Sequence, residues 1–279
     1  MALTSRENET GTSETCPDCG GRGWVVALDK SAGSATPCSC RQRDRKGRLL
    51  AAAGIPARYR HCKLASFQVS SGSREEKAQL LQAKTTAQQY VDDFLQPGGR
   101  FRESGLLFIG PPGAGKTHLA VAVLVAAIEK FNVHARFAEF TSLIHQIQST
   151  FDPGSPESKR EVLDPLIDAE LLALDELGAQ QPTPWVRDIL YLIINNRYTR
   201  RLPTLFTTNY RLAPAPGRTP VAQLDRGRDT EPRQDEAALL TGRLSPMLVS
   251  RLYEMAQPVM LTGVEDFRRE HAVHGAHLR

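Results

Sequence analysis

The sequence lacks any apolar stretch long enough to cross a membrane. Its longest apolar run extends from Leu119 to Ile128, whereas a membrane-spanning helix needs about 20 such residues. The first residues, Met1 to Thr15, are polar and contain no apolar segment of a secretory signal peptide. We therefore expect a cytoplasmic protein that has no membrane partner and begins with a disordered stretch.

A strong excess of charge is also missing. The net charge is +4 and the sequence pI is about 8.9, a mildly basic balance that is compatible with nucleic acid but does not indicate it. Apolar residues make up 41% and charged residues 24% of the 279 residues. This composition is typical of a soluble globular protein with one large domain, or a main domain and a small one.

Cysteine is nearly absent after residue 40, where only Cys62 occurs, and we expect that side chain to be buried. Four others form the pairs Cys16-Pro-Asp-Cys19 and Cys38-Ser-Cys40. In a reducing compartment such a cluster favours a metal over disulfides. Four thiolates at this spacing predict a structural Zn²⁺ site, although an iron–sulfur cluster would use the same ligands. The glycines between Gly20 and Gly23 allow backbone N–H groups to reach the sulfurs.

Two features of this cysteine module leave alternatives open. The apolar residues Trp24, Val25 and Val26 fit either a small core or a partner-binding surface, and we predict the core. The basic run that follows, Arg41, Arg43, Arg45, Lys46 and Arg48, fits either phosphate contacts or a solvated helix face.

A phosphate-binding loop is the most specific motif of the chain. The segment Gly110-Pro-Pro-Gly-Ala-Gly-Lys116-Thr117 has four free positions between two glycines, followed by Lys and Thr. An apolar strand precedes it and an apolar helix follows it, which is the context the motif needs. Its backbone N–H groups are then expected to hold phosphate oxygens, Lys116 to neutralise their charge, and Thr117 to ligate Mg²⁺.

From residue 106 onward the pattern alternates between strand and helix, which is typical of a parallel α/β sheet. The predicted strands are 106–109, 135–139, 171–174, 204–207 and 259–261, and the predicted helices are 75–95, 118–130, 142–150, 184–200 and 244–255. Residues 152–160 are predicted as a loop. We divide the chain into the cysteine module (1–48), a linker (49–74) and an ATPase domain (75–279), with an insertion at 211–241.

Polar residues end two of the predicted strands. Asp175 and Glu176 follow one strand, and Asn209 follows another. The carboxyl ends of parallel strands meet at one edge of the sheet, beside the phosphate loop. We therefore predict that Asp175 holds Mg²⁺, that Glu176 deprotonates the attacking water, and that Asn209 contacts the water or the γ-phosphate.

Together these motifs resemble those of AAA+ ATPases, and among them the DnaC/IstB group of helicase loaders and transposition ATPases. The resemblance covers residues 54–279 and rests on Gly54-Ile-Pro56, the phosphate loop with His118-Leu-Ala120, Leu172-Ala-Leu-Asp-Glu-Leu-Gly178, Ile194-Asn-Asn-Arg-Tyr198, Thr207-Thr-Asn209 and Val249-Ser-Arg-Leu252. It implies a three-layer, parallel-sheet AAA+ P-loop NTPase core behind a small N-terminal zinc-binding module.

The resemblance also implies roles for particular residues. The nucleotide is bound by Gly110, Pro111, Pro112, Gly113, Ala114, Gly115, Lys116, Thr117, His118 and Arg268. Arg251 is the arginine finger that reaches a neighbouring subunit's nucleotide, with Arg243 as a rival because of the insertion. Single-stranded DNA is contacted by the segment of roughly 141–162, with Phe151, Lys159 and Arg160 as the candidate residues, although Phe151 fits a core position equally well.

The resulting prediction is an ATPase that uses ATP, Mg²⁺ and Zn²⁺, assembles into a ring or spiral, and loads a DnaB-type replicative helicase onto single-stranded DNA. The cysteine module resembles one that docks on the helicase in some loaders. One alternative is an IstB-like regulator of the target choice of a transposase. Another is an adaptor that binds ATP without turnover.

Overall fold

The computed structural model describes residues 16–27, 34–69, 73–152, 154, 157–180, 183–212, 239–261 and 267. The chain divides into two compact units, Met1–Arg48 and Leu49–Arg279. No helix in the described ranges is both long and apolar enough to span a membrane.

The first unit contains a small antiparallel hairpin. Strand β1 (Trp24–Ala27) pairs with β2 (Ser34–Pro37), and helix α1 (Ser39–Ala52) begins directly after them. The predicted core role is wrong for two residues of β1, since Trp24 is 44% and Val25 37% exposed. Among the side chains described between residues 16 and 48, only Cys19 and Cys38 are buried. The hairpin is too small to cover its own apolar side chains.

The second unit is built on a five-stranded parallel sheet with the order β4-β5-β6-β3-β7. The strands are β3 (Gly105–Ile109), β4 (Ala135–Glu139), β5 (Leu171–Asp175), β6 (Thr204–Thr208) and β7 (Ala256–Met260). Every residue of β3, β5 and β6 is buried, as expected for strands covered on both faces. The parallel α/β sheet predicted from the sequence is confirmed.

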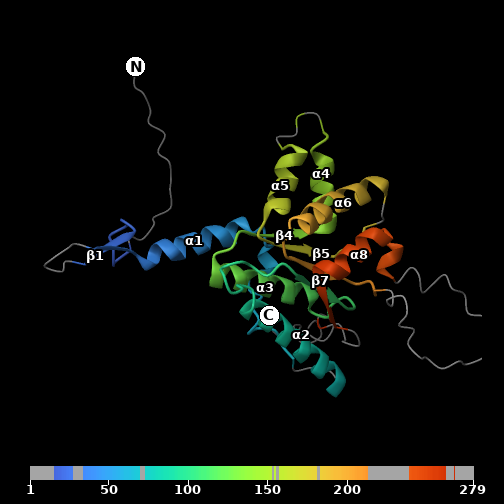
Figure 1. Ribbon diagram of the computed structural model, residues 1–279, viewed down its shortest axis with the longest axis horizontal. Helices are drawn as coiled ribbons and strands as arrows, with labels where there is room; N and C mark the ends of the chain where they lie inside the picture. Colours follow the sequence, from blue (N-terminus) through green and yellow to red (C-terminus); the bar gives the residue numbers. More distant parts are fainter. Residues whose placement is uncertain are drawn as a thin grey trace, which may run out of the picture. The chain divides into compact units, whose positions relative to one another are not determined.

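Helices cover both faces of this sheet, which gives three layers (Figure 1). On one face lie α2 (Arg74–Asp92) and α3 (Lys116–Phe131); on the other lie α4 (Phe140–Ser149), α5 (Lys159–Asp168), α6 (Pro184–Thr199) and α8 (Pro246–Met255). Short helical turns occur at Ala57–Tyr59 and Leu240–Gly242. Alternate residues of β3 join different cores, because Leu106 packs with the first helices and Leu107 with the second.

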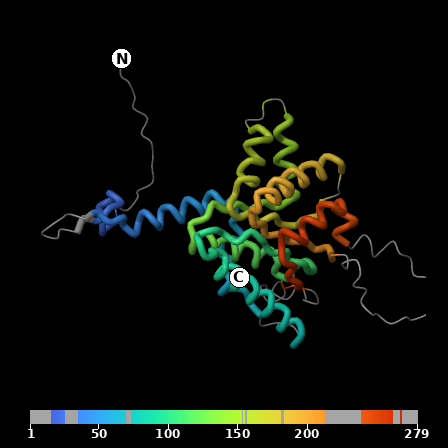
Figure 2. Tube along the Cα trace, in the orientation of Figure 1, coloured from blue at the N-terminus to red at the C-terminus, as the bar shows by residue number. Residues whose placement is uncertain are grey.

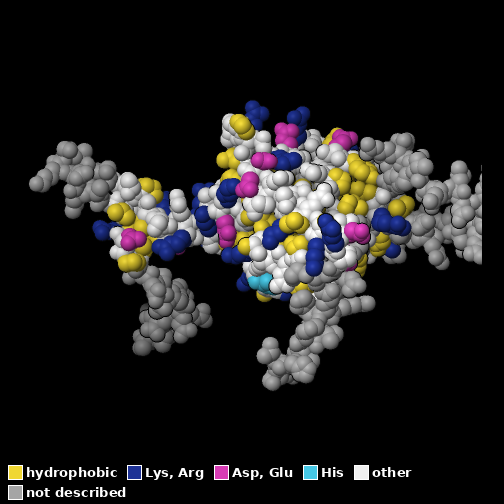
Figure 3. All heavy atoms as spheres, turned by 90° about the horizontal axis from the view of Figure 1, so that it is seen from below, with side chains coloured by type: hydrophobic (Ala, Val, Ile, Leu, Met, Phe, Trp, Pro, Cys, Tyr) yellow, Lys and Arg dark blue, Asp and Glu magenta, His cyan; other side chains and the backbone are white. Residues whose placement is uncertain are grey.

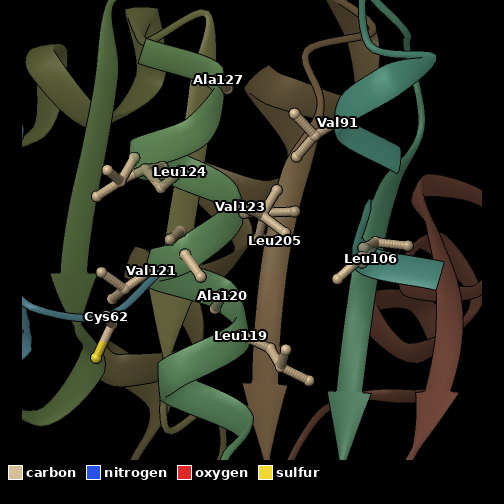
Figure 4. Close-up of a cluster of buried hydrophobic side chains, with 14 of the residues drawn as sticks. Cys62, Val91, Leu106, Leu119, Ala120, Val121, Val123, Leu124, Ala127 and Leu205 are labelled. Carbon is tan, nitrogen blue, oxygen red and sulfur yellow. The ribbon is translucent and has the colours of Figure 1, made fainter. Parts of the chain in front are cut away.

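Helix α3 lies at the centre of the first core. Its side chains Leu119, Val123 and Leu124 meet residues from neighbouring elements, among them Leu205 of β6 (Figure 4). Cys62 belongs to the same cluster and is 2% exposed, so the prediction of a buried side chain is confirmed. Burial raises the pKa of the Cys62 thiol to about 11.

The segment expected to be a linker, 49–74, contributes side chains to this core. Ile55, Leu64 and Phe67 are all buried there. The segment also protects an open edge of the sheet, because the N–H of Phe137 in edge strand β4 donates to the carbonyl of Ala53 at 2.7 Å. An exposed edge strand would otherwise present unpaired backbone groups.

The path of the chain (Figure 2) includes one helix that the sequence analysis did not foresee. The predicted loop 152–160 is wrong for its last two residues, because α5 begins at Lys159. Ser158 and Glu161 form a capping box that satisfies the free N–H groups of its first turn.

Only the base of the predicted insertion, 211–241, belongs to the described residues. There Arg211 and Leu239 form a parallel bridge, and the N–H of Leu240 donates to the carbonyl of Arg211 at 2.8 Å. The two ends of the insertion are therefore adjacent.

Candidate functional site

The phosphate loop connects β3 to α3 and closes on Gly115, which has a φ of 91°. Side chains other than glycine rarely adopt this left-handed conformation. The position is also crowded, since a Cβ on Gly115 would lie 2.6 Å from Cε2 of Phe67. Glycine is thus required at this position by both the backbone conformation and the packing.

Lys116 and Thr117 begin α3. The Lys116 side chain is only 7% exposed, and its Nζ donates to the carbonyl of Pro111 at 2.7 Å. The ammonium group therefore lies folded over the loop in which a phosphate would sit. This position suits charge neutralisation of a bound phosphate.

Asp175 lies at the carboxyl end of β5 and is 1% exposed. Its Oδ1 accepts from the hydroxyl of Thr117 at 2.9 Å and from that of Thr207 at 2.6 Å. Burial raises the pKa of the Asp175 carboxyl, although both hydroxyl groups act against this shift. A hydroxyl and a carboxylate oxygen in contact are the hard oxygen ligands that Mg²⁺ prefers, so the donor set fits this ion.

Glu176 and Asn209 follow the neighbouring strands β5 and β6. The backbone N–H of Glu176 donates to Oγ1 of Thr207 at 2.9 Å, and its φ is 58°. Asn209 is exposed at the end of β6. The structure thus brings Thr117 and Asp175 into contact. It places Glu176 and Asn209 directly after the carboxyl ends of two adjacent strands.

Sequence reasoning missed the segment 61–67, which lies against the first turn of α3. Nε2 of His118 is 3.0 Å from the carbonyl of Lys63, so this nitrogen carries the proton and donates. The Phe67 ring meets the His118 ring edge-on at a centroid distance of 5.4 Å. Burial lowers the pKa of His118. The phosphate-loop motif does not predict that the segment 61–67 covers the first turn of α3, because this segment lies about fifty residues upstream.

The candidate arginines lie on different elements. Arg251 of α8 is half-buried, and its guanidinium lies 5.0 Å from the ring centre of Tyr191 and 5.4 Å from that of Tyr198, both on α6. Its Nη1 is buried and has no hydrogen-bond partner among the residues that the structure describes. Arg243 stacks instead on Tyr210, at 4.8 Å. Arg268 lies outside the described residues.

The residues predicted to contact DNA lie at the α4–α5 connection and the start of α5. Phe151 is 62% exposed and meets the ring of Trp185 edge-on at 6.2 Å. Arg160 is exposed and Lys159 half-buried in the first turn of α5. An exposed aromatic ring in this connection and two cations at the start of the next helix are compatible with a stacked base and its phosphates.

The four clustered cysteines meet in the first unit. The Sγ atoms of Cys16 and Cys38 are 3.8 Å apart and those of Cys19 and Cys40 3.5 Å, and all four lie within 4.8 Å of one another. Four sulfurs at about 2.3 Å from one Zn²⁺ would be separated by about 3.8 Å, the edge of the tetrahedron. The cluster therefore fits a structural Zn²⁺ ion.

Backbone groups prepare this cluster for a metal. The N–H of Gly23 donates to Sγ of Cys19 at 3.3 Å and lowers the pKa of that thiol to about 7. This is the contact expected from the glycines that follow Cys19. No described cysteine forms a disulfide.

Several known proteins are similar to this chain. Residues 61–214 match the family described as IstB-like ATP binding protein. The replicative helicase loader DnaC of Escherichia coli strain K12 is 26% identical over 156 residues, which cover 56% of this chain and 58% of DnaC. A putative ATP-binding protein of insertion sequence IS5376 from Geobacillus stearothermophilus is 32% identical over 108 residues, 39% of this chain and 41% of that protein. The chain thus spans about half the length of these relatives.

A solved structure also matches. The crystal structure of the DnaC helicase loader superposes with a TM-score of 0.55 and 28% identity, covering 74% of this chain and 99% of that one. This match confirms the predicted fold class, a three-layer AAA+ P-loop core, and the resemblance to DnaC-type ATPases.

Proposed function

Because this chain belongs to the family of IstB-like ATP binding proteins, we propose that it is an ATP-hydrolysing loader of a DnaB-type replicative helicase. In this proposal it acts in the cytoplasm and delivers the helicase to single-stranded DNA, with hydrolysis as the switch. The contact of Thr117 with Asp175 beside the phosphate loop is the observation that carries the proposed activity. The relationship to DnaC supports the client.

The proposed hydrolysis uses groups at the carboxyl edge of the sheet. Lys116 neutralises the β- and γ-phosphates, while Thr117 and Asp175 would hold Mg²⁺, which would withdraw charge from the phosphate oxygens. Glu176 accepts a proton from water as the water oxygen bonds to the γ-phosphorus. The bond from that phosphorus to the bridging oxygen breaks, and ADP takes the electron pair. Asn209 orients the water.

The remaining parts of the proposal concern assembly. Arg251 completes the site of a neighbouring subunit, so the active form is a homo-oligomeric ring or open spiral. Arg268 contacts nucleotide in its own subunit. Phe151, Lys159 and Arg160 contact single-stranded DNA, and the zinc-bound cysteine module docks on the helicase.

A turnover measurement tests the enzymatic part. We expect Glu176→Gln to bind ATP as the wild type does but to hydrolyse it at least about a hundredfold more slowly, because the water loses its base. Glu129→Gln is the matched control, since Glu129 is exposed on α3. Equal turnover in Glu176→Gln and wild type would instead identify an adaptor that binds ATP without hydrolysis.

A binding experiment tests the client. A pull-down with purified replicative helicase should retain the wild type but lose the Cys16→Ser/Cys19→Ser variant. Cys62→Ala serves as control, because Cys62 lies in the core of the other unit. Equal retention of all three would contradict docking through the cysteine module.

The relationship to the IS5376 protein favours a second candidate, an IstB-like regulator of transposition. It would use the same ATPase site, so turnover does not separate the two functions. Stable binding to a transposase, together with no binding to the helicase, would favour this second function.

A further inference from the structure

We infer that the N-terminal unit carries its own binding site for single-stranded nucleic acid, separate from the proposed contacts at α4 and α5. We call it the Trp24 face and define it by Trp24, Val25, Arg41, Arg45 and Arg48. The site adds a nucleic-acid contact to the proposed function but requires neither ATP hydrolysis nor a helicase client.

The first observation is an exposed aromatic ring held in place by a cation. Trp24 is 44% exposed, and the neighbouring Val25 is 37% exposed. The guanidinium of Arg41 lies 5.0 Å from the centre of the Trp24 ring. One face of a large ring is thus fixed by a stacked cation, a geometry that also favours base stacking beside it.

The second observation is the charge of helix α1. Between residues 41 and 48 it carries five cations, Arg41, Arg43, Arg45, Lys46 and Arg48, against one carboxylate, Asp44. No ion pair joins any of these cations to a carboxylate in the part of the chain that the structure describes. They are therefore available to an external anion. Figure 3 shows hydrophobic and Lys or Arg side chains together on the visible surface of this unit, along with an Asp or Glu side chain.

The spacing of three arginines organises this charge. Arg41, Arg45 and Arg48 stand at positions i, i+4 and i+7 of α1 and are all exposed, so they share one side of the helix. At 1.5 Å per residue the stripe is about 10 Å long. It begins at the residue that stacks on Trp24, which makes the ring and the cations one continuous surface.

These features together select the ligand class. Arginine forks bind phosphate diesters, and a row of them follows a polyanion. A duplex hides the faces of its bases, whereas a single strand offers unpaired bases to Trp24. The carboxylates of an acidic protein segment would pair with the arginines, but they would not stack on the exposed indole of Trp24 beside them. Single-stranded nucleic acid therefore matches both halves of the face.

Tryptophan emission provides a direct probe, because the chain has two tryptophans, Trp24 and Trp185. In a full-length Trp185→Phe background only Trp24 reports. Titration with an oligo(dT) strand of about 15 nucleotides, without ATP or helicase, should quench its emission. Unchanged emission at saturating strand would overturn the inference.

The charge is tested by replacing the stripe. The variant Arg41→Gln/Arg45→Gln/Arg48→Gln removes three phosphate contacts, so the slope of log K against log salt should fall by about 2 for a single strand. At about 0.1 M salt this corresponds to roughly hundredfold weaker binding. The control variant Arg74→Gln/Lys77→Gln/Arg100→Gln removes three exposed cations of the other unit and should keep the wild-type slope.

Two measurements test whether the stripe variant still folds. Its metal content and its circular dichroism should match those of the wild type, because the three replaced side chains are exposed. Equal slopes in the stripe variant and the control would contradict the inference. Quenching of Trp24 by a DnaB-type helicase, with none by oligo(dT), would assign the face to a protein partner instead. No arm of this experiment depends on ATP hydrolysis or on helicase loading.

Discussion

Thr207 holds the acidic end of β5 in position from the neighbouring strand. Its hydroxyl donates to Asp175 at 2.6 Å and accepts from the N–H of Glu176 at 2.9 Å. Glu176 has a φ of 58°, a left-handed conformation that costs a non-glycine residue about 1–2 kcal/mol. The bond from Thr207 offsets part of this cost and fixes the proposed base next to the proposed metal ligand.

The burial of Asp175 gives a prediction about stability and pH. Burial raises the pKa of this carboxyl above its ordinary value of 3.8, so the folded chain holds its proton at a higher pH than the unfolded chain. Asp175 therefore makes folding less favourable as the pH rises from 3.8 through the raised pKa. Asp175→Asn should raise the free energy of unfolding at pH 7 by about 1 kcal/mol in Mg²⁺-free buffer.

Urea unfolding over a pH series measures this effect. The gain of Asp175→Asn over wild type should shrink as the pH falls toward 3.8. Asp188→Asn, which changes an exposed carboxylate of α6, should show no such gain. Added Mg²⁺ and ATP should stabilise the wild type more than Asp175→Asn, because the variant loses a proposed Mg²⁺ ligand. A loss of stability in Asp175→Asn at pH 7 would refute the explanation that burying the charged Asp175 carboxylate destabilises the fold.

The residues of the site differ in how far the sequence predicts them. Lys116, Thr117 and Asp175 belong to local patterns, a glycine loop and a strand with a polar end, and the contact between Thr117 and Asp175 follows from parallel strands. The roles of Thr207 and Phe67 depend on contacts across more than thirty residues of chain. No local pattern records such contacts, so only the folded structure reveals them.

At the scale of elements, the pair α6–α8 holds the proposed arginine finger. Tyr191 and Tyr198 stack on the guanidinium of Arg251, and the Tyr198 hydroxyl donates to Glu254 of α8 at 2.7 Å. Stacked rings restrict the guanidinium without occupying its N–H groups, and the buried Nη1 has no acceptor among the described residues. The half-buried side chain leaves part of the guanidinium to solvent, and in the proposed assembly the two tyrosines would hold that part in place for the anion of a neighbouring subunit.

This arrangement predicts a graded loss of turnover. Arg251→Ala should lower the ATPase rate about a thousandfold if it acts as a finger. Tyr191→Ala/Tyr198→Ala should lower it about tenfold, because the guanidinium then samples more orientations. Tyr198→Phe keeps the ring and should retain most activity. The rates are compared at several protein concentrations, since a contact between subunits requires assembly.

Mixed assemblies separate this role from a structural one. Arg251→Ala keeps an intact nucleotide site, whereas Lys116→Ala keeps an intact finger, so mixing the two should restore activity that neither has alone. Tyr191→Ala/Tyr198→Ala mixed with Arg251→Ala should restore less. Wild-type turnover in the double tyrosine variant would contradict the positioning role.

The elements themselves were predictable where apolar periodicity specifies them. The parallel strands and helices α2, α3, α4, α6 and α8 follow from such patterns, with ends shifted by a few residues. Helix α5 was missed because it contains Pro165 and many polar residues, and its start depends on a capping box. The hairpin β1–β2 was missed because each strand has only four residues and none of their described side chains is buried, so no apolar periodicity marks them.

At the scale of the whole molecule, the two units draw their stability from different sources. The unit that begins at Leu49 has two apolar cores around a sheet. In the unit that ends at Arg48, the buried side chains among those described are Cys19 and Cys38. A segment of this size without an apolar core needs a metal or a disulfide to fold, and its cysteines form no disulfide.

Removal of the metal should therefore unfold one unit and spare the other. With a chelator selective for Zn²⁺, in the presence of excess Mg²⁺, the Trp24 emission of the Trp185→Phe protein should shift to that of a solvated indole, while thermal unfolding of the ATPase unit and its ATP affinity stay unchanged. Cys16→Ser/Cys19→Ser should reproduce this result and lower the Zn²⁺ content from about one ion per chain to none. Cys62→Ala should keep the ion but lower the melting temperature of the ATPase unit, because Cys62 belongs to that core. A chelator that moves the melting transition of the ATPase unit, or leaves Trp24 unaffected, would show that the units do not fold independently in this way.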